Sequence, residues 1–165
     1  GVSQSREAAV DVQAWTLLRR YGVVFRRILT REAGAATWGG LAMLYRRLGA
    51  RGEIRGGRFV SGMSGEQFAL PEAVQALREV RRSRADGRFD VVSAADPLNL
   101  AGIITAGERI RVAGRNRIVY RDGVPIAVRE GEDVRSLVPG DTSISADVLR
   151  ALFPRTQHYA HPSFV

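Results

Sequence analysis

The sequence predicts an α+β chain of two parts, with helices in the first half and short strands in the second. Up to about residue 52, apolar side chains repeat every three or four positions. Beyond it, short apolar runs alternate with glycine-containing turns. Charge divides the chain in the same way, because residues 1–88 hold 16 arginines against 8 acidic residues and residues 89–165 hold 9 of each. We therefore predict a flexible N-terminus at 1–10, a mainly helical domain at 11–88, and a β-rich domain with a C-terminal tail at 89–165.

Three helices are expected before the change of period. The first ends at Tyr21-Gly22, because glycine is the usual residue just beyond a helix C-terminus. Thr37 is a favourable N-cap for the third, which closes near Gly52. The three helices are predicted at residues 11–20, 23–31 and 38–48.

A hairpin and a further helix are predicted next. Gly56-Gly57 lies between two short strands at 53–55 and 58–60, which favours a two-residue hairpin turn. Three helices followed by a hairpin is the order of a winged helix-turn-helix. Pro71 suits the first turn of a helix over residues 72–82, which bridges to the second half.

The second half is typical of a small antiparallel domain. Asp122-Gly123 favours a tight hairpin turn, and Ser145 is a good N-cap for a last helix that ends at Leu152. Strands are predicted at residues 89–92, 103–104, 110–112, 117–120 and 124–128. The predicted fold class is thus α+β: a winged helix-turn-helix followed by a small β-barrel-like antiparallel domain.

Composition excludes several kinds of chemistry. The chain has no cysteine and no lysine, so thiol chemistry, disulfides and the lysine-dependent Walker A loop are all excluded. The exclusive use of arginine also fits a GC-rich genome. Its two histidines, His158 and His161, lack a nearby acid, so we predict no metal site and no cofactor in this chain. Without a long apolar run, the sequence predicts a cytoplasmic protein with no membrane contact.

Several short motifs together resemble one known family. Over roughly residues 12–130 the chain is similar to the C-terminal region of the large helicase-related (Lhr) proteins. The residues that carry the resemblance are Arg20-Tyr21-Gly22-Val23-Val24-Phe25-Arg26, Leu44-Tyr45-Arg46-Arg47-Leu48, Arg51-Gly52-Glu53-Ile54-Arg55-Gly56-Gly57-Arg58-Phe59-Val60, Gln67-Phe68-Ala69-Leu70-Pro71, Ala95-Asp96-Pro97-Leu98-Asn99 and the hairpin at 120–125.

The resemblance implies a piece of a bacterial superfamily 2 DNA helicase involved in DNA repair. Lhr proteins move 3′ to 5′ on DNA, and ATP and Mg²⁺ belong to a motor that this chain lacks. Their long forms end in winged helices and a β-barrel module similar to helix-turn-helix DNA glycosylases, to which uracil-glycosylase activity has been ascribed. Three functions follow as hypotheses: a DNA-binding module for single-stranded or branched DNA, a uracil glycosylase, or a module for homo-oligomerisation or for contact with the rest of the helicase.

The positive half supplies the candidate DNA contacts. Guanidinium groups bind phosphates through paired hydrogen bonds and release counterions. Trp38 and Tyr45 could stack on an unpaired base, although aromatics at helical spacing are more often core, and the core interpretation is favoured more for Tyr45 than for Trp38. The alternative is a solvated basic face on a winged helix that binds only proteins. The candidate DNA-binding residues are Arg26, Arg27, Trp38, Arg46, Arg47, Arg51, Arg55 and Arg58.

Asp96 is the candidate catalytic residue of the β-rich half. A positioned carboxylate can stabilise a cationic sugar and activate water, as glycoside cleavage requires. Asp96 precedes Pro97 in a turn, with Asn99 as a possible hydrogen-bonding partner. The same position suits an aspartate that caps its own turn, and this interpretation is the favoured one.

Overall fold

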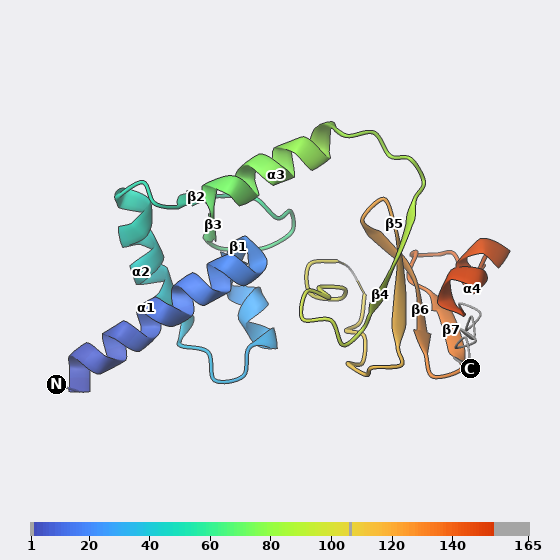
Figure 1. Cartoon of the computed structure of the whole chain (residues 1–165), viewed down its shortest axis with the longest axis horizontal. Helices are drawn as coiled ribbons and strands as arrows, with labels where there is room; N and C mark the ends of the chain where they lie inside the picture. Colours follow the sequence, from blue (N-terminus) through green and yellow to red (C-terminus); the bar gives the residue numbers. More distant parts are fainter. Residues whose placement is uncertain (1, 106, 154–165) are drawn as a thin grey trace, which may run out of the picture. The chain divides into compact units, whose positions relative to one another are not determined.

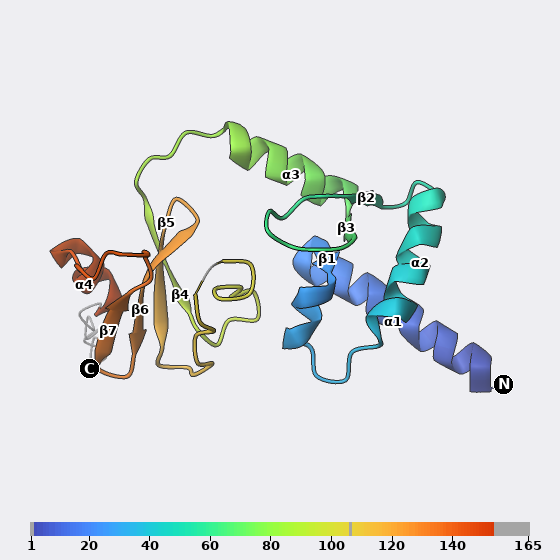
Figure 2. The same ribbon diagram turned by 180° about the vertical axis from the view of Figure 1, so that it is seen from behind.

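The computed structural model describes residues 2–105 and 107–153, which divide into two compact units (Figure 1). The first unit runs to Arg84 and includes Gly102–Ala106, and the second begins at Ala85. Helices dominate the first unit, and an antiparallel sheet forms the second (Figure 2). The fold class is α+β, as predicted.

The first unit has the element order of a winged helix. Its sheet has the order β1-β3-β2 and is antiparallel throughout, with Phe68 of β3 opposite Val24 on one side and Gly56 on the other. We call the loop between β2 and β3, residues 58–66, the wing. The elements are α1 (Val2–Tyr21), β1 (Val23–Phe25), the 3₁₀ helix η1 (Arg26–Arg31), α2 (Trp38–Ala50), β2 (Arg55–Gly57), β3 (Gln67–Ala69) and α3 (Pro71–Arg82).

Aromatic rings form much of the core of this unit. Tyr45 of α2 is fully buried, and its ring centroid lies 5.2 Å from that of Phe68 and 6.5 Å from that of Trp38. The Tyr45 hydroxyl donates a 3.0 Å hydrogen bond to the carbonyl of Ala14 in α1, and burial raises the pKa of Tyr45 above its ordinary value. Tyr45 is therefore a core residue that joins α1, α2 and the sheet.

The first helix is longer than predicted. We expected it at residues 11–20 with a flexible stretch before it, but α1 is helical from Val2. Residues 4–9 are exposed, so they show none of the apolar periodicity on which the prediction relied. Ala8, Ala9, Glu7 and Arg6 are nevertheless good helix formers, and no glycine or proline interrupts them.

The second predicted helix, at 23–31, is wrong in its first part. Val23–Phe25 forms strand β1, and only Arg26–Arg31 turns, as a 3₁₀ helix. β-Branched and aromatic residues favour strands when a partner is present. That partner is β3, more than forty residues later in the chain, so a local reading could not find it.

The predicted turn at Gly56-Gly57 is also wrong. Both glycines lie inside β2 and pair with Phe68 and Gln67. The turn is instead the nine-residue wing, 58–66. Apolar Phe59 and Val60 resemble a return strand in sequence, but their backbone amides bond to the side chain of Gln67 rather than to a neighbouring strand.

The second unit is a four-stranded antiparallel sheet. Its order is β4-β5-β6-β7, and within the described residues β4 and β7 do not pair with each other. The sheet is therefore open, and the expectation of a barrel-like closure is wrong. Its elements are β4 (Phe89–Ser93), β5 (Arg117–Arg121), β6 (Val124–Glu130), β7 (Asp133–Ser136) and α4 (Ala146–Leu152).

Each face of this sheet has its own apolar cluster. Val119 and Ala127 pack with Val148 and Leu152 of α4 on one face. On the opposite face, Ile118 and Val128 pack against loop residues that include Ile110. The strands predicted at 103–104 and 110–112 are loops, because the burial of Ile103 and Ile110 and not strand pairing explains their apolar character.

Two local predictions are confirmed in the second unit. Asp122 and Gly123 have φ angles of 50° and 78°, which is the left-handed pair that a tight hairpin turn needs. Ser145 caps α4, because its hydroxyl oxygen accepts a hydrogen bond from the amide of Val148 at 3.4 Å. Strand β7 was not predicted, since its four residues alternate around charged Asp133 and Arg135 without a strong apolar signal.

Candidate nucleic-acid interface

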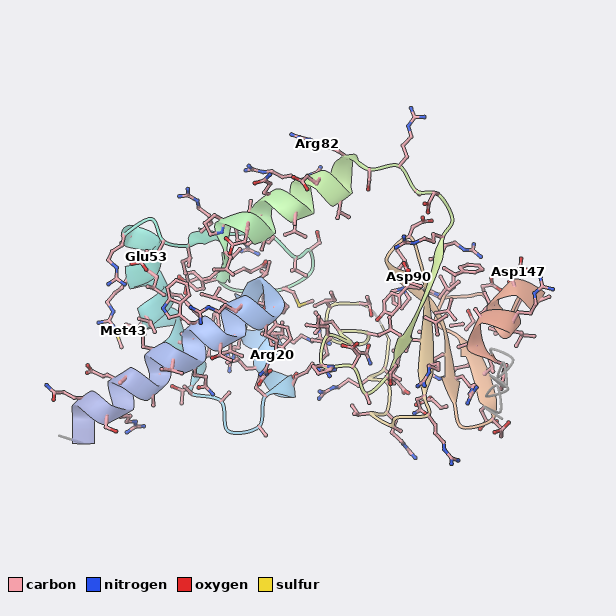
Figure 3. The ribbon with its side chains drawn as sticks, viewed as in Figure 1. Arg20, Met43, Glu53, Arg82, Asp90 and Asp147 are labelled. Carbon is pink, nitrogen blue, oxygen red and sulfur yellow. The ribbon has the colours of Figure 1, made fainter. Side chains whose placement is uncertain are left out.

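Helix α2 presents a polar face to solvent. Its buried residues Leu41, Leu44, Tyr45 and Leu48 follow the helical period, so the positions between them point outward. Arg46 and Arg47 are exposed on that outward face. Met43 lies there too, with 61% of its surface exposed, and Figure 3 labels its position. Thr37 fixes the start of the helix, because its hydroxyl oxygen accepts a hydrogen bond from the amide of Gly40 at 3.4 Å. Two arginines thus lie on the helix that a winged helix presents to DNA.

The wing is shaped from inside by the side chain of Gln67. This residue is fully buried, and its Oε1 accepts hydrogen bonds from the amides of Phe59 at 2.8 Å and Val60 at 2.7 Å. Its Nε2 donates to the carbonyls of Val60 at 2.9 Å and Met63 at 3.4 Å. The side chain of Gln67 therefore supplies the hydrogen bonds that a neighbouring strand would otherwise provide, and it fixes the backbone that follows Arg58.

Sequence reasoning did not single out Gln67. The available signal was a long amide side chain at the start of the apolar run Gln67-Phe68-Ala69-Leu70, since a buried polar group must find hydrogen-bond partners. That signal says that partners exist, but not which backbone groups they are.

Two of the predicted DNA-binding arginines are engaged by carboxylates. Arg46 of α2 forms a two-point ion pair with Glu66 of the wing, with Nε–Oε1 and Nη2–Oε2 distances of 2.8 and 2.5 Å. The hydrogen bonds from Arg46 hold the pKa of Glu66 below its ordinary value. Arg51 bonds Glu53 through Nε and Oε1 at 2.5 Å. A phosphate would have to compete with these carboxylates.

Three other predicted arginines have no such partner. Arg47 on α2, Arg55 on β2 and Arg58 at the start of the wing are exposed. Their guanidinium groups have no hydrogen bond or ion pair to the described part of the chain. Helix α2, strand β2 and the wing thus each carry a guanidinium group that is available to a ligand.

The other predicted DNA-binding residues, Arg26, Arg27 and Trp38, have different surroundings. Arg26 and Arg27 belong to η1, and Nη2 of Arg27 donates to the carbonyl of Gly102 at 3.4 Å, within the same unit. Trp38 is partly buried, with its ring centroid 6.2 Å from that of Phe68, so it extends the aromatic cluster. The structure therefore places Arg46 and Arg47 on α2, Arg55 on β2, Arg58 in the wing, and Arg26 and Arg27 on η1.

An open groove of about 610 Å³ separates the N-terminal half of α1 from α2. Met43 and Arg47 line it from α2, and Glu7 and Asp11 line it from α1. Arg6 lines the groove as well, so its charged side chains are two arginines and two acids.

A second polar cluster closes the other end of α1. Arg20 contacts both carboxylate oxygens of Glu32 at 2.7 and 2.8 Å, and the Tyr21 hydroxyl donates to Glu32 Oε1 at 2.5 Å. Burial opposes ionisation of Glu32, but the hydrogen bonds from Tyr21 and Arg20 outweigh it and lower its pKa. This cluster ties α1 to the chain after η1 and has a structural role.

Asp96 lies in a self-capped turn of the second unit. Its Oδ1 accepts a hydrogen bond from the amide of Leu98 at 2.8 Å, and its carbonyl accepts one from the amide of Asn99 at 2.9 Å. The Asn99 side chain bonds the carbonyl of Ala94 and the amide of Ala101, both at 3.1 Å. This geometry is that of a capping aspartate, while a catalytic role for Asp96 stays a prediction.

No metal site is apparent in the part of the chain that the structure describes, where no three acidic or histidine side chains gather. His158 and His161 lie outside the described residues. None of the described helices combines the length and apolarity of a membrane span.

Together, the strand order β1-β3-β2, the outward arginines of α2 and the wing define a winged-helix domain. Residues 3–89 match the family model of the large helicase-related protein winged-helix domain, and the chain belongs to this family. The predicted resemblance to Lhr proteins is confirmed. The chain is also similar to a protein of Escherichia coli (strain K12) named Lhr helicase/uracil glycosylase, with 32% identity over 92 residues. The match covers 54% of this chain and 6% of that protein.

Proposed function

We propose that this chain is a DNA-binding module of an ATP-dependent Lhr-type helicase that acts in bacterial DNA repair in the cytoplasm. The observation that carries the proposal is the exposure of Arg47, Arg55 and Arg58 on α2, β2 and the wing, without partners in the described residues. Winged helices commonly contact DNA through these same two elements, the helix in a groove and the wing on the backbone.

The chemistry favours binding to the phosphate backbone. Guanidinium groups pair with phosphates and release condensed counterions, so affinity falls as salt rises. The outward face of α2 offers Met43, Arg46, Arg47 and Gly39 but no asparagine or glutamine, the side chains that read adenine through two hydrogen bonds. We therefore propose a weakly sequence-specific interface for single-stranded or branched DNA.

Family membership supports the wider context. The matched E. coli protein is named a helicase, and this chain corresponds to a small part of its length. We propose that ATP and Mg²⁺ act in the motor of the parent protein and that the rest of the helicase is this module's main partner. Neither cofactor has a role in this chain under the proposal.

The direct test compares two matched pairs of arginines. Arg55→Gln with Arg58→Gln removes two positive charges near the wing, and Arg111→Gln with Arg115→Gln removes two exposed charges from the second unit. DNA affinity is measured by fluorescence anisotropy at several salt concentrations. We expect the first pair to flatten the plot of log affinity against log salt by about two units and the second pair to leave it unchanged. Unchanged affinity for the first pair would reject this interface.

The name of the relative supports one alternative, a uracil glycosylase. Under this alternative Asp96 is the catalytic carboxylate and acts on a flipped base. Asp96→Asn would then keep the fold and abolish uracil release from a labelled oligonucleotide. The capping geometry of Asp96 instead predicts a lower melting temperature for Asp96→Ala. If the wild-type chain releases no uracil, this alternative fails.

A module for self-association is the third possibility. It predicts a molar mass that rises with protein concentration and no affinity for DNA. Sedimentation of the chain, with and without an oligonucleotide, separates this possibility from the DNA-binding proposal.

A further inference from the structure

A dense group of arginines lies at the end of α3, away from the winged-helix face described above. Arg78, Arg81, Arg82 and Arg84 fall within seven residues that contain one acid, Glu79. All four are exposed, and their guanidinium groups have no hydrogen bond or ion pair within the part of the chain that the structure describes. We call these four residues the α3 arginines.

Helical spacing brings most of this charge to one face. Arg78, Arg81 and Arg82 occupy positions i, i+3 and i+4, which are neighbours on a helix surface. Glu79 forms no ion pair with them among the described residues, and its Oε1 accepts a hydrogen bond from Gln75 at 3.0 Å. Its single negative charge also leaves most of the positive charge of the four arginines in place. Arg82 lies at the end of α3 and points away from the ribbon (Figure 3). The α3 arginines therefore form a concentrated positive surface.

Helix α3 contributes no buried side chain to a hydrophobic core. It buries none of its residues, although its first turn contacts the rest of the unit: a Cβ on Gly22 would lie 3.0 Å from Cβ of Ala73. The amide of Leu70, just before the helix, donates to the carbonyl of Gly22 at 3.0 Å. Its base is thus fixed to the winged helix, while its far end is solvated.

Like charges three and four residues apart weaken an isolated helix. The partial negative charge at the helix C-terminus offsets part of this repulsion, and a bound polyanion would remove it. Arginine is suited to phosphate in particular, because its planar guanidinium donates two parallel hydrogen bonds to phosphate oxygens. The surface thus has the chemistry of a phosphate-binding site.

We propose that the α3 arginines form a second phosphate-contact surface, which extends the nucleic-acid site along α3 beyond the wing. This proposal rests on the proposed DNA-binding function. At a rise of about 1.5 Å per residue, Arg81 lies about 15 Å along the helix from Pro71. We therefore expect Arg81 to contact other phosphates than those that contact α2 and the wing.

The partner is the backbone of a nucleic acid rather than an acidic membrane or protein. The same compact unit carries the exposed arginines of α2 and the wing, and a regular row of phosphates can contact both groups at once. The amphipathic character of α3, with Leu77 and Val80 exposed at 42% and 70%, makes a lipid surface the outcome to be tested against.

The experiment measures binding to duplexes of two lengths. Arg81→Gln with Arg82→Gln is compared with wild type and with the matched pair Arg111→Gln and Arg115→Gln, all in the full chain. Glutamine keeps a high helix propensity, and circular dichroism checks that α3 stays helical. A short duplex of about one helical turn covers the winged-helix face alone, whereas a duplex of about three turns also reaches α3.

We expect Arg81→Gln with Arg82→Gln to bind the short duplex like wild type and the long duplex several-fold more weakly. Its salt slope on the long duplex should fall by about two units. The matched pair should behave like wild type on both. Wild-type affinity for the long duplex in the α3 variant would overturn the proposal, as would an equal loss on both lengths, which would place these arginines within the wing's own footprint.

A separate result identifies failure of the proposed function itself. If wild type binds neither duplex and also fails to bind a single strand and a forked DNA of the longer length, the winged-helix interface fails whatever α3 does. It also fails if Arg55→Gln with Arg58→Gln leaves wild-type affinity for all of these DNAs. Vesicles that contain phosphatidylserine supply the last arm. Loss of vesicle binding in the α3 variant, with an unchanged DNA slope, would overturn the proposal in favour of a lipid surface.

Discussion

The two units differ in how the protein engages some of their arginines. In the second unit, Arg117 donates to the carbonyl of Gly114 at 2.6 Å, and Arg129 donates to the carbonyls of Gly131 and Leu152 at 3.0 and 2.9 Å. Arg121 lies over the ring of Phe89 at 5.0 Å. In the first unit, Arg47, Arg55 and Arg58 have no partner among the described residues. Both units contain paired and exposed arginines, but the exposed ones of the first unit lie on the helix and the wing of a winged-helix fold.

The difference follows from the acids and carbonyls within reach. The stretch 89–165 balances its 9 arginines with 9 acidic residues, whereas residues 1–88 carry twice as many arginines as acids. Excess charge that finds no internal partner stays hydrated at the surface, where it costs little and attracts polyanions. Net charge alone would show the imbalance, but only the contacts show which arginines are free.

The largest expected effects come from creating a cavity in the core of each unit, which lowers the free energy of unfolding. Leu48 and Ile118 are 1% and 0% exposed, one in each unit, and truncation of either to alanine is expected to cost about 2–5 kcal/mol. Urea unfolding measures both losses. We expect Leu48→Ala to reduce DNA binding as its unit unfolds and Ile118→Ala to spare it in the folded population. Equal loss of binding in both variants would contradict separate roles for the units.

The wing should be the next most sensitive feature. Gln67→Leu leaves the amides of Phe59 and Val60 without their acceptor, which we expect to destabilise the first unit by about 2 kcal/mol. Hydrogen exchange at those two amides should accelerate. Gln75→Leu, an exposed change on α3, serves as the control and should alter stability by less than about 0.5 kcal/mol. Slow exchange in Gln67→Leu would show that another group holds the wing.

A pair of single arginine changes sharpens the contrast directly. Arg129→Gln removes two hydrogen bonds and the contact with the Phe153 ring at 4.6 Å, so we expect a loss of about 1–2 kcal/mol with DNA affinity unchanged. Arg47→Gln should leave the melting temperature within a degree or two and weaken DNA binding. Thermal melts and anisotropy titrations measure the two effects. An exchange of these outcomes would reverse the assignment of roles.

The smallest expected effect is a pH dependence at Glu32. Its pKa is lowered in the folded state, so its contribution to stability is complete above the unfolded value of about 4.5 and is lost as pH falls through the folded pKa. Below pH 4.5, wild type should therefore lose stability more steeply than Glu32→Gln. Urea unfolding at a series of acidic pH values checks this, and parallel curves would remove Glu32 from the account.

Local signals predicted much of the fold. Thr37, Pro71, Ser145 and Asp122-Gly123 each mark a helix start or a turn, and α2, α3, α4 and the β5–β6 hairpin appear where those residues place them. What failed depends on distant partners. Strand β1 forms because β3 pairs with it. Strand β7, the last strand of the open sheet, pairs with β6 and carries little apolar pattern, so the sequence did not indicate it.

For the candidate site, the sequence indicated which elements carry the arginines but not which of their side chains are paired. The sequence locates arginines on the third helix and beside the wing, and the structure places them there. It does not reveal that Arg46 is paired with Glu66, twenty residues away, because an ion pair across a loop leaves no periodic trace. The same limit hides Gln67, whose partners are backbone groups of a loop.

The internal support of the wing also bears on how such a module can change over time. Gln67 holds residues 59, 60 and 63 through backbone atoms, so it places no demand on the side chains at the tip. Ser61 and Ser64 are exposed and take no part in that support. Substitutions there can alter what the wing touches while the scaffold stays intact. The buried amide of Gln67 thus fixes the backbone shape of the loop independently of the side chains at its tip. Those side chains can therefore change, by natural variation or by design, while the loop keeps its shape.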